Sequence, residues 1–173
     1  MSLTSDPPFA RGSTLGGGVA TLDSSFGGNW VGMQKVFLDV TPSTGLLNTN
    51  RRVRCIALRN STGSTLTKGQ LVKFRIGDAL SLAVTTDAQV GVVDEYIPSG
   101  GVLANDVFWA VVEGPTSVAT AATPAVGTKL AVGTSGNAIA GIGLGETTAT
   151  ASGGLVRTIV GGTVNSAAIA TAT

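Results

Sequence analysis

Few side chains in this chain have the types and spacing that catalysis or metal binding requires. The 173 residues include no histidine and a single cysteine, Cys55. Histidine is the usual general base and metal ligand near neutral pH, and a structural zinc site needs several cysteine or histidine ligands. Cys55 stands in the apolar run Cys-Ile-Ala-Leu, which favours a buried structural thiol over a nucleophile. The sequence therefore predicts neither a zinc site nor histidine-based catalysis.

The remaining motifs fit no known catalytic or nucleotide-binding arrangement. Asp94 and Glu95 are adjacent, and neighbouring residues of a strand point to opposite faces, so they do not form a carboxylate pair. The segment Gly-Ile-Gly-Leu-Gly-Glu at 141–146 lacks the spacing of a nucleotide-binding glycine loop, and no helix is expected after it. We predict that the chain is not an enzyme and that it uses no cofactor or metal.

The composition favours a component of an assembly over a free monomer. Charged residues make up 12% of the chain against about 25% in typical domains, and the formal net charge is +1. Such a surface gives little repulsion between copies, so it is easier to keep in solution when partners cover part of it. We expect no membrane span, because no run approaches about 18 apolar residues. The first residues also lack the pattern of a signal peptide.

Charge is sorted along the sequence. Residues 51–75 carry seven of the eleven basic groups and no acid, while residues 76–128 carry six of the ten acids and no base. Two explanations remain open: oppositely charged neighbours in an assembly, or internal pairing across strands. The near-neutral balance argues against nucleic acid as a partner, since nucleic-acid-binding domains are strongly basic.

From residue 51 onward the pattern predicts an all-β domain. Runs rich in β-branched and aromatic residues recur every eight to twelve residues between turn signals, as in small barrels and sandwiches. In one of these runs we expect Leu80, Leu82 and Val84 to share one face of a strand. The predicted strands cover 53–58, 70–76, 77–84, 90–97, 106–114, 128–132, 138–144 and 153–162.

The stretch 111–140 has only two ionisable side chains, Glu113 and Lys129. We interpret it as the end of one strand, a Thr/Ala-rich connection bounded by Pro115 and Pro124, and a hairpin that turns at 133–137. Its small side chains would permit close packing against a neighbouring strand or subunit. We expect contacts from this stretch, not chemistry.

The first fifty residues differ from the rest. Glycine and proline are too dense there for a helix or a regular sheet, yet large apolar residues recur: Phe9, Phe26, Trp30 and Phe37. We predict an extended N-terminal arm over residues 1–50 that lies on another surface, followed by a β-domain over residues 51–173. The alternative is a flexible leader followed by one strand at 35–40.

The turn and strand pattern of residues 56–162 resembles the β-modules of tailed-bacteriophage structural proteins, in particular head decoration (cement) proteins. The most specific segment is LRNSTGSTLTKGQLVKF at 58–74, and AVTTDAQVGVVDEYIPSGG at 83–101 continues the pattern. VFWAVVEGPTSV at 107–118, AVGTKLAVGTSGNA at 125–138 and GETTATASGGLVRTIVGG at 145–162 complete it. The resemblance implies a small β-barrel or β-tulip domain, often a homotrimer, on the lattice of the major capsid protein.

The sequence thus predicts a virion structural protein that binds the outer capsid surface and stabilises the capsid lattice after assembly in the bacterial cytoplasm. Its candidate partner-binding residues are the four arm aromatics above and three arginines at the start of the β-domain, Arg51, Arg52 and Arg54. The alternative is a phage tail, baseplate or fibre module. A third class, a carbohydrate- or ligand-binding domain, would need exposed aromatics, for which Tyr96 and Trp109 are the candidates in the β-domain.

Overall fold

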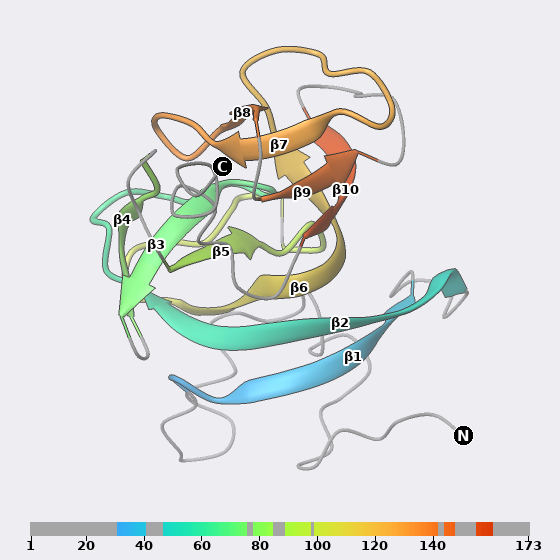
Figure 1. The fold of residues 1–173 in the computed structure, drawn as a ribbon. Helices are drawn as coiled ribbons and strands as arrows, with labels where there is room; N and C mark the ends of the chain where they lie inside the picture. Colours follow the sequence, from blue (N-terminus) through green and yellow to red (C-terminus); the bar gives the residue numbers. More distant parts are fainter. Residues whose placement is uncertain are drawn as a thin grey trace.

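The computed structural model describes residues 31–40, 47–75, 78–84, 89–97, 99–141, 144–147 and 155–160. All regular structure in these ranges is β-strand, which confirms the all-β prediction (Figure 1). The described part of the chain holds no long apolar helix of the kind that crosses a membrane. The strands are β1 (Gln34–Val40), β2 (Leu47–Asn60), β3 (Leu71–Arg75), β4 (Asp78–Leu82), β5 (Val90–Val93), β6 (Val107–Ala119), β7 (Lys129–Val132), β8 (Ala138–Ala140), β9 (Gly145–Thr147) and β10 (Leu155–Val160).

Five strands form a barrel-like ring of hydrogen-bonded pairs. Its order is β2, β4, β3, β5 and β6, and the antiparallel pairing of β6 with β2 returns to the start. Every neighbouring pair is antiparallel except β2 and β4, which run parallel. That parallel contact consists of only two residue pairs, Arg59–Asp78 and Asn60–Ala79. We call it the seam, and because it is so short the ring does not close into a complete barrel.

A second sheet grows from the same long strand. From Gly114 onward β6 pairs with β10, and the order continues through β9 and β7 to β8. An isolated parallel bridge between Thr120 and Ala138 joins β8 back to the residue that follows β6. The long β6 therefore belongs to both sheets, one along each half of its length.

The expected end of this strand at Gly114 is wrong, because β6 continues through Pro115 to Ala119. Proline cannot donate a backbone hydrogen bond and is tolerated where a strand has one partner only. Pro115 sits opposite Ile159 of β10, beyond the last β6 residue that pairs with β2, Glu113. Pro115 therefore lies where β6 no longer pairs with β2, so its missing N–H removes no hydrogen bond between these two strands.

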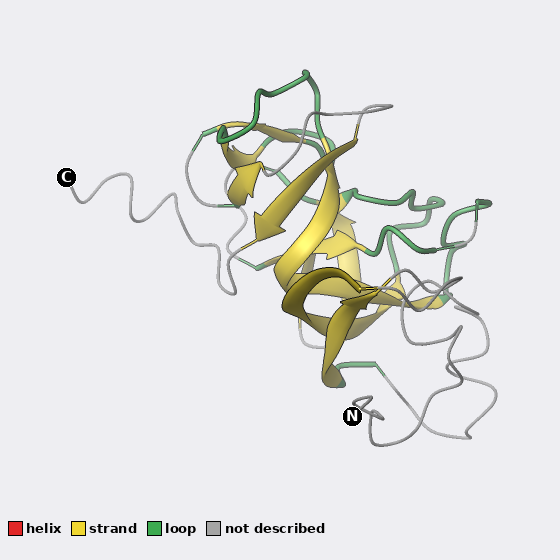
Figure 2. Ribbon diagram, turned by 90° about the vertical axis from the view of Figure 1, so that its right-hand side faces the viewer, coloured by secondary structure: helices red, strands yellow, loops and turns green. Residues whose placement is uncertain are grey.

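Both faces of β2 from Val53 onward and of β6 are largely buried, which explains their continuous apolar runs. Cys55 and Trp109 belong to one apolar cluster, which also contains residues of β7 and β10 such as Leu130 and Val160. Their sequence neighbours Ile56 and Phe108 belong to a second cluster on the opposite face. Figure 2 shows the strands of both sheets stacked in one body, with the described loops at its periphery.

The predicted hairpin at 133–137 is confirmed, and its turn is bonded into the ring. β7 and β8 pair in antiparallel fashion, with Val132 opposite Ala138. In the turn between them, Gly136 accepts a hydrogen bond from the Leu71 amide at 2.8 Å and donates one to the Ala83 carbonyl at 3.1 Å. The turn thus bonds to residues of β3 and of the segment that follows β4, as its small residues suggested.

Leu80 and Val84 point away from the core, whereas Leu82 packs partly against the second apolar cluster. Ala79 and Ala83 are fully buried, whereas Leu80 and Val84 are 41% and 39% exposed and Leu82 is half-buried. The pairing register of β3 and β4 shifts between Lys73 and Phe74, whose partners are Ser81 and Ala79, so Leu80 is skipped. Strand register decides which face is buried, and here the small residues of β4 are the ones turned inward.

Part of the predicted arm belongs to the sheet. β1 pairs with β2 from Gln34 opposite Ile56 to Val40 opposite Leu47, and β2 runs without a break across residue 50. The rest of the predicted arm, residues 1–30 and 41–46, lies outside the described residues apart from the short segment 31–33 that leads into β1.

We predict that Gly114→Ala destabilises the protein by about 2–5 kcal/mol, from left-handed backbone strain and overpacking together. Gly114 has φ +105°, and an added Cβ would overlap the Arg52 carbonyl oxygen and lie 3.0 Å from the Val53 Cα. The matched control is Gly63→Ala, where φ is +77° but nothing lies within 4 Å of an added Cβ. Urea unfolding of both variants measures the difference, and equal losses would contradict a steric role for Gly114.

Candidate interaction surface

Phe37 packs inside the chain's own core. It is 7% exposed, and its ring meets Trp109 edge-on, with centroids 5.3 Å apart and planes at 74°. This geometry is favourable for an aromatic pair. Phe37 therefore holds β1 onto the ring and is not available as an anchor for a partner. The other three aromatic candidates, Phe9, Phe26 and Trp30, lie outside the described residues.

The three candidate arginines have different environments. Arg52 is exposed on β2, opposite Leu38 of β1. Arg54 lies two residues further along and makes an ion pair with Glu113 of β6, with its Nε 3.0 Å from Oε2. The side chain of Arg51 lies outside the described residues. Of the three, Arg52 is the one that the structure describes as exposed.

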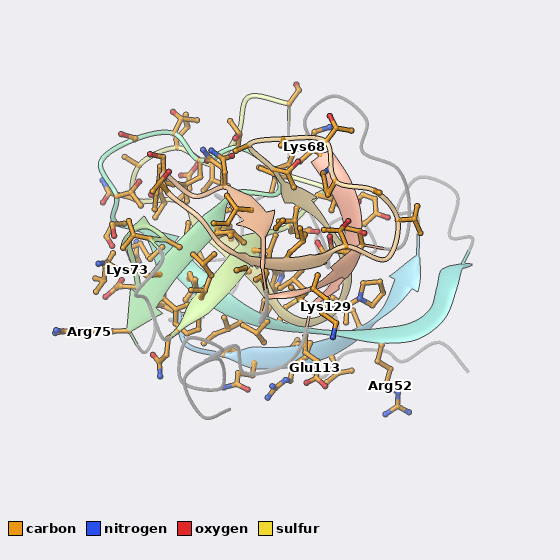
Figure 3. The ribbon with its side chains drawn as sticks, turned by 45° about the horizontal axis from the view of Figure 1, so that its top comes forward. Arg52, Lys68, Lys73, Arg75, Glu113 and Lys129 are labelled. Carbon is orange, nitrogen blue, oxygen red and sulfur yellow. The ribbon has the colours of Figure 1, made fainter. Side chains whose placement is uncertain are left out.

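Several basic residues face acids across neighbouring strands. Arg59 and Arg75 both stand opposite Asp78, one on each side of β4. Lys129 of β7 stands opposite Glu146 of β9. Figure 3 shows Lys73 and Arg75 on one side of the molecule and Arg52 on the other, so the basic run of the sequence does not gather into one patch. The register favours internal pairing as the reason for the sorted charges.

Two of the described residues that bear reactive groups, Cys55 and Asp94, are built into the core. Cys55 is fully buried, and burial, reinforced by the charge of Asp94, raises the pKa of its thiol well above the usual value. Asp94 is itself buried, whereas the neighbouring Glu95 is half-buried and accepts a hydrogen bond from the Ser117 hydroxyl at 2.5 Å. Within the described ranges no three Cys, Asp or Glu side chains gather in a way that would hold a metal ion.

The aromatic candidates for ligand binding are also packed. Trp109 is buried, and Tyr96 is half-buried against the same apolar cluster. A carbohydrate platform presents an aromatic face to solvent, which the position of Trp109 does not allow.

One surface groove among the described residues lies beside the seam, where β2 and β4 part. A groove of about 450 Å³ opens between the segment that follows β2 and the second half of β4. Thr62, Ser64, Thr65 and Leu66 line it from the first segment, and Ser81, Leu82 and Val84 from the second, together with Ser135 of the β7–β8 turn. Its lining contains five hydroxyl groups and three aliphatic side chains, and no ionisable group.

Asn60 holds one wall of this groove in place. Its fully buried side chain donates to the carbonyl oxygens of Ser64, Val102 and Leu103 at 2.8, 3.0 and 3.1 Å. Its Oδ1 accepts from the Thr62 amide at 3.1 Å and from the Thr62 hydroxyl at 2.7 Å. A buried amide that satisfies so many partners fixes the loop after β2 against the 102–103 segment.

Sequence reasoning missed the groove. Its walls come from a turn and from the face of β4 that carries Leu82 and is followed by Val84, and the sequence did not indicate whether this face is buried or exposed. A usable signal was present: residues 79–84 alternate small residues, Ala79, Ser81 and Ala83, with larger aliphatic ones, and small residues that face the interior leave the larger ones outside. The pattern alone does not say which set is inside, because that depends on register.

No protein-family model matches the chain, and no curated protein matches it. A solved structure with partial similarity is that of the head fiber gp8.5 N base of bacteriophage phi29, at 16% sequence identity and a TM-score of 0.41. The match covers 64% of this chain and 95% of that one. A TM-score of this size does not establish a common fold, so the proposals below rest on the chain's own residues.

Phe37→Ala is expected to lower the free energy of unfolding by about 3–5 kcal/mol, as for other buried aromatic truncations. The control is Val36→Ala, one residue away on β1, where the side chain is already half exposed and little is lost. Denaturant unfolding of both variants tests this placement. A Phe37→Ala protein of unchanged stability would return Phe37 to the list of candidate anchors.

The Cys55 thiol is expected to react with a disulfide reagent only when the chain unfolds. Its raised pKa keeps it protonated in the folded state, and burial excludes the reagent. As pH rises through about 8.5 the unfolded chain ionises first, so this group lowers stability above that pH. Labelling rates at pH 7 and pH 9, with and without denaturant, measure the effect.

The labelling control is Ser64→Cys in a Cys55→Ala background, since Ser64 is exposed and should react freely in the folded protein. Rapid labelling of Cys55 under native conditions, with a rate that rises with pH as for Ser64→Cys, would contradict the buried assignment.

Proposed function

We propose that the chain is a structural protein of a tailed-bacteriophage virion, which binds the outer surface of the capsid and stabilises the lattice of the major capsid protein. The observation that carries the proposal is the extent of the sequence resemblance. It spans residues 56–162, and the strands from β3 to β10 lie within that range. These strands belong to one β-body, which also includes β1 and the part of β2 that precedes residue 56.

Within this proposal, residues that are not engaged inside the body are the candidates for capsid binding. β1 packs on β2, so the segment available to reach a neighbouring surface is the one that precedes it, with Phe9, Phe26 and Trp30 as its anchors. Each anchor that becomes fully buried contributes about 1.5–3 kcal/mol. Arg52 remains as an exposed charge for an acidic patch, whereas Arg54 is engaged with Glu113.

Several arms acting together would strengthen attachment. If the body forms a homotrimer at a symmetry axis of the capsid, each further arm binds within the same complex, and apparent affinity rises well above that of one arm. The low charge of the chain supports such self-association, because copies repel one another little.

The second candidate is a tail, baseplate or fibre module of the same virion. It is kept because the strand and turn pattern that supports the first candidate also occurs in those proteins. Cryo-electron microscopy of the virion separates the two, since a decoration protein follows the capsid lattice and a tail or baseplate module does not.

The capsid-binding role is tested by replacing the three arm aromatics. The Phe9→Ala, Phe26→Ala, Trp30→Ala variant is expected to lose at least about a thousandfold in affinity for capsids of the encoding phage, since three anchors of about 1.5–3 kcal/mol each are removed. Co-sedimentation with capsids that lack the protein measures binding.

The matched control is Leu103→Ala, which removes an exposed aliphatic side chain from the body and leaves the arm intact. Both variants should unfold at the same denaturant concentration as the wild type. Full capsid binding by the triple variant would refute the arm, and absence of binding by the wild type to any virion component would refute the proposed function.

A further inference from the structure

The groove beside the seam has the size and the mixed lining of a small-molecule site. Its volume of about 450 Å³ falls within the range of about 300–1,000 Å³ that such sites occupy. Leu66 lines it although only 1% of that residue is exposed, so its side chain forms the floor. Leu82 and Val84 add aliphatic surface on one wall, and five hydroxyl groups surround these apolar residues.

Three of the five hydroxyl groups are available to a ligand. The hydroxyls of Thr62 and Ser81 already donate to neighbouring groups of the chain. The hydroxyls of Ser64, Thr65 and Ser135 form no hydrogen bond with another described residue, and all three residues are exposed. They come from two separate segments, the loop after β2 and the β7–β8 turn, so a ligand in the groove meets them from two sides.

The main chain on the β4 side of the groove is already bonded. The Ala83 amide donates to the Leu71 carbonyl at 2.8 Å, and the Ala83 carbonyl accepts from the Gly136 amide at 3.1 Å. The Leu82 carbonyl accepts from the Ser81 hydroxyl at 3.2 Å. These bonds disfavour an extended peptide that adds to β4 as a further strand, because such a peptide needs open main-chain groups. Recognition in the groove therefore falls to the side chains.

The lining selects the chemistry of the ligand. None of the lining residues is ionisable, so a charged ligand would lose solvation without a counter-charge. A purely apolar ligand would remove water from the hydroxyl groups and replace none of their hydrogen bonds. A sugar hydroxyl both donates and accepts, as serine and threonine hydroxyls do, and the C–H face of a sugar ring packs on aliphatic side chains. A neutral saccharide thus matches both parts of the lining.

We propose that the groove beside the seam binds a short segment of a neutral saccharide. Ser64, Thr65 and Ser135 supply the hydrogen bonds, and the aliphatic floor receives the ring. The bonds of Asn60 fix one wall before the ligand arrives, which lowers the entropy lost on binding. No aromatic ring lines the groove, so each site is weak, and several copies in one assembly would bind a polysaccharide more tightly than one copy does.

The experiment is a titration of the full chain, labelled with nitrogen-15, followed by amide chemical shifts. The neutral probes are maltotriose, cellotriose, mannotriose and chitobiose, and the acidic probes are sialyllactose and digalacturonate. At least one neutral probe is expected to shift amide signals of the groove residues with a millimolar Kd. The acidic probes are expected to bind at least about tenfold more weakly than that neutral probe, because the groove offers them no counter-charge.

A double variant tests whether the groove hydroxyls hold the saccharide. Ser64→Ala with Ser135→Ala removes one hydroxyl from each side and is expected to weaken binding at least about tenfold. The matched control is Thr67→Ala with Thr134→Ala, which removes two exposed hydroxyls from the same two segments outside the groove. The control is expected to bind as the wild type does, and both variants should unfold at the same urea concentration.

Three results would overturn the proposal: no shift of groove signals with any neutral probe, equal affinity for the acidic probes, or unchanged binding by the Ser64→Ala, Ser135→Ala protein. Tighter binding of an uncharged peptide rich in serine and threonine at the same residues would assign the groove to a peptide and would also overturn it.

The saccharide site goes beyond the proposed capsid role and is tested separately from it. Loss of saccharide binding in the groove variant, with capsid binding intact, would leave the proposed function in place. Loss of the proposed function, through wild-type protein that binds no virion component, would leave a saccharide site that titrates as described.

Discussion

The close approach of β6 to β2 at Gly114 is the constraint on which the rest of the architecture depends. The Arg52 carbonyl oxygen occupies the space that a Cβ would need, and φ of +105° turns the strand away from β2. From that point β6 pairs with β10, so one continuous strand serves two sheets. The apolar cluster that contains Cys55 and Trp109 can then extend to Leu130 and Val160 of the second sheet. Without the turn at Gly114, the ring and the second sheet would not share a core.

The same strand pairing explains why basic and acidic residues, which occupy separate parts of the sequence, lie next to each other on the surface. Strands from the basic run, β2 and β3, pair with strands from the acidic run, β4 and β6. Arg54 therefore meets Glu113, and Arg59 and Arg75 flank Asp78. Each exposed pair contributes little stability by itself, but register errors would place like charges side by side. The separation of basic and acidic residues along the sequence thus helps to select which strands pair, more than it helps to select external partners.

Much of the fold could be predicted from local pattern, because the runs around Cys55, Val72 and Phe108 are β-rich and bounded by turn residues. The hairpin at 133–137 was predictable for the same reason. Three features were not. The extension of β6 through Pro115 depends on which side of the strand has a neighbour, and the outward face of β4 depends on register. The burial of Phe37 depends on Trp109, which is far away in sequence. The groove at the seam depends on the same register, so the alternation of small and larger residues in β4 does not predict it by itself.

The hydrogen bonds of Gly136 also bear on how the chain is made. Leu71 and Ala83 belong to the first half of the sequence, yet the Leu71 amide and the Ala83 carbonyl find their partner in a turn more than fifty residues later. During translation the early strands must therefore wait, with these groups bonded to water, until the turn has left the ribosome. Pairing over such separations slows folding, because the entropy of closing the loop is lost before the contacts form. The two sheets are therefore not expected to fold one after the other on the ribosome, because the ring can complete its bonding only after Gly136 has emerged.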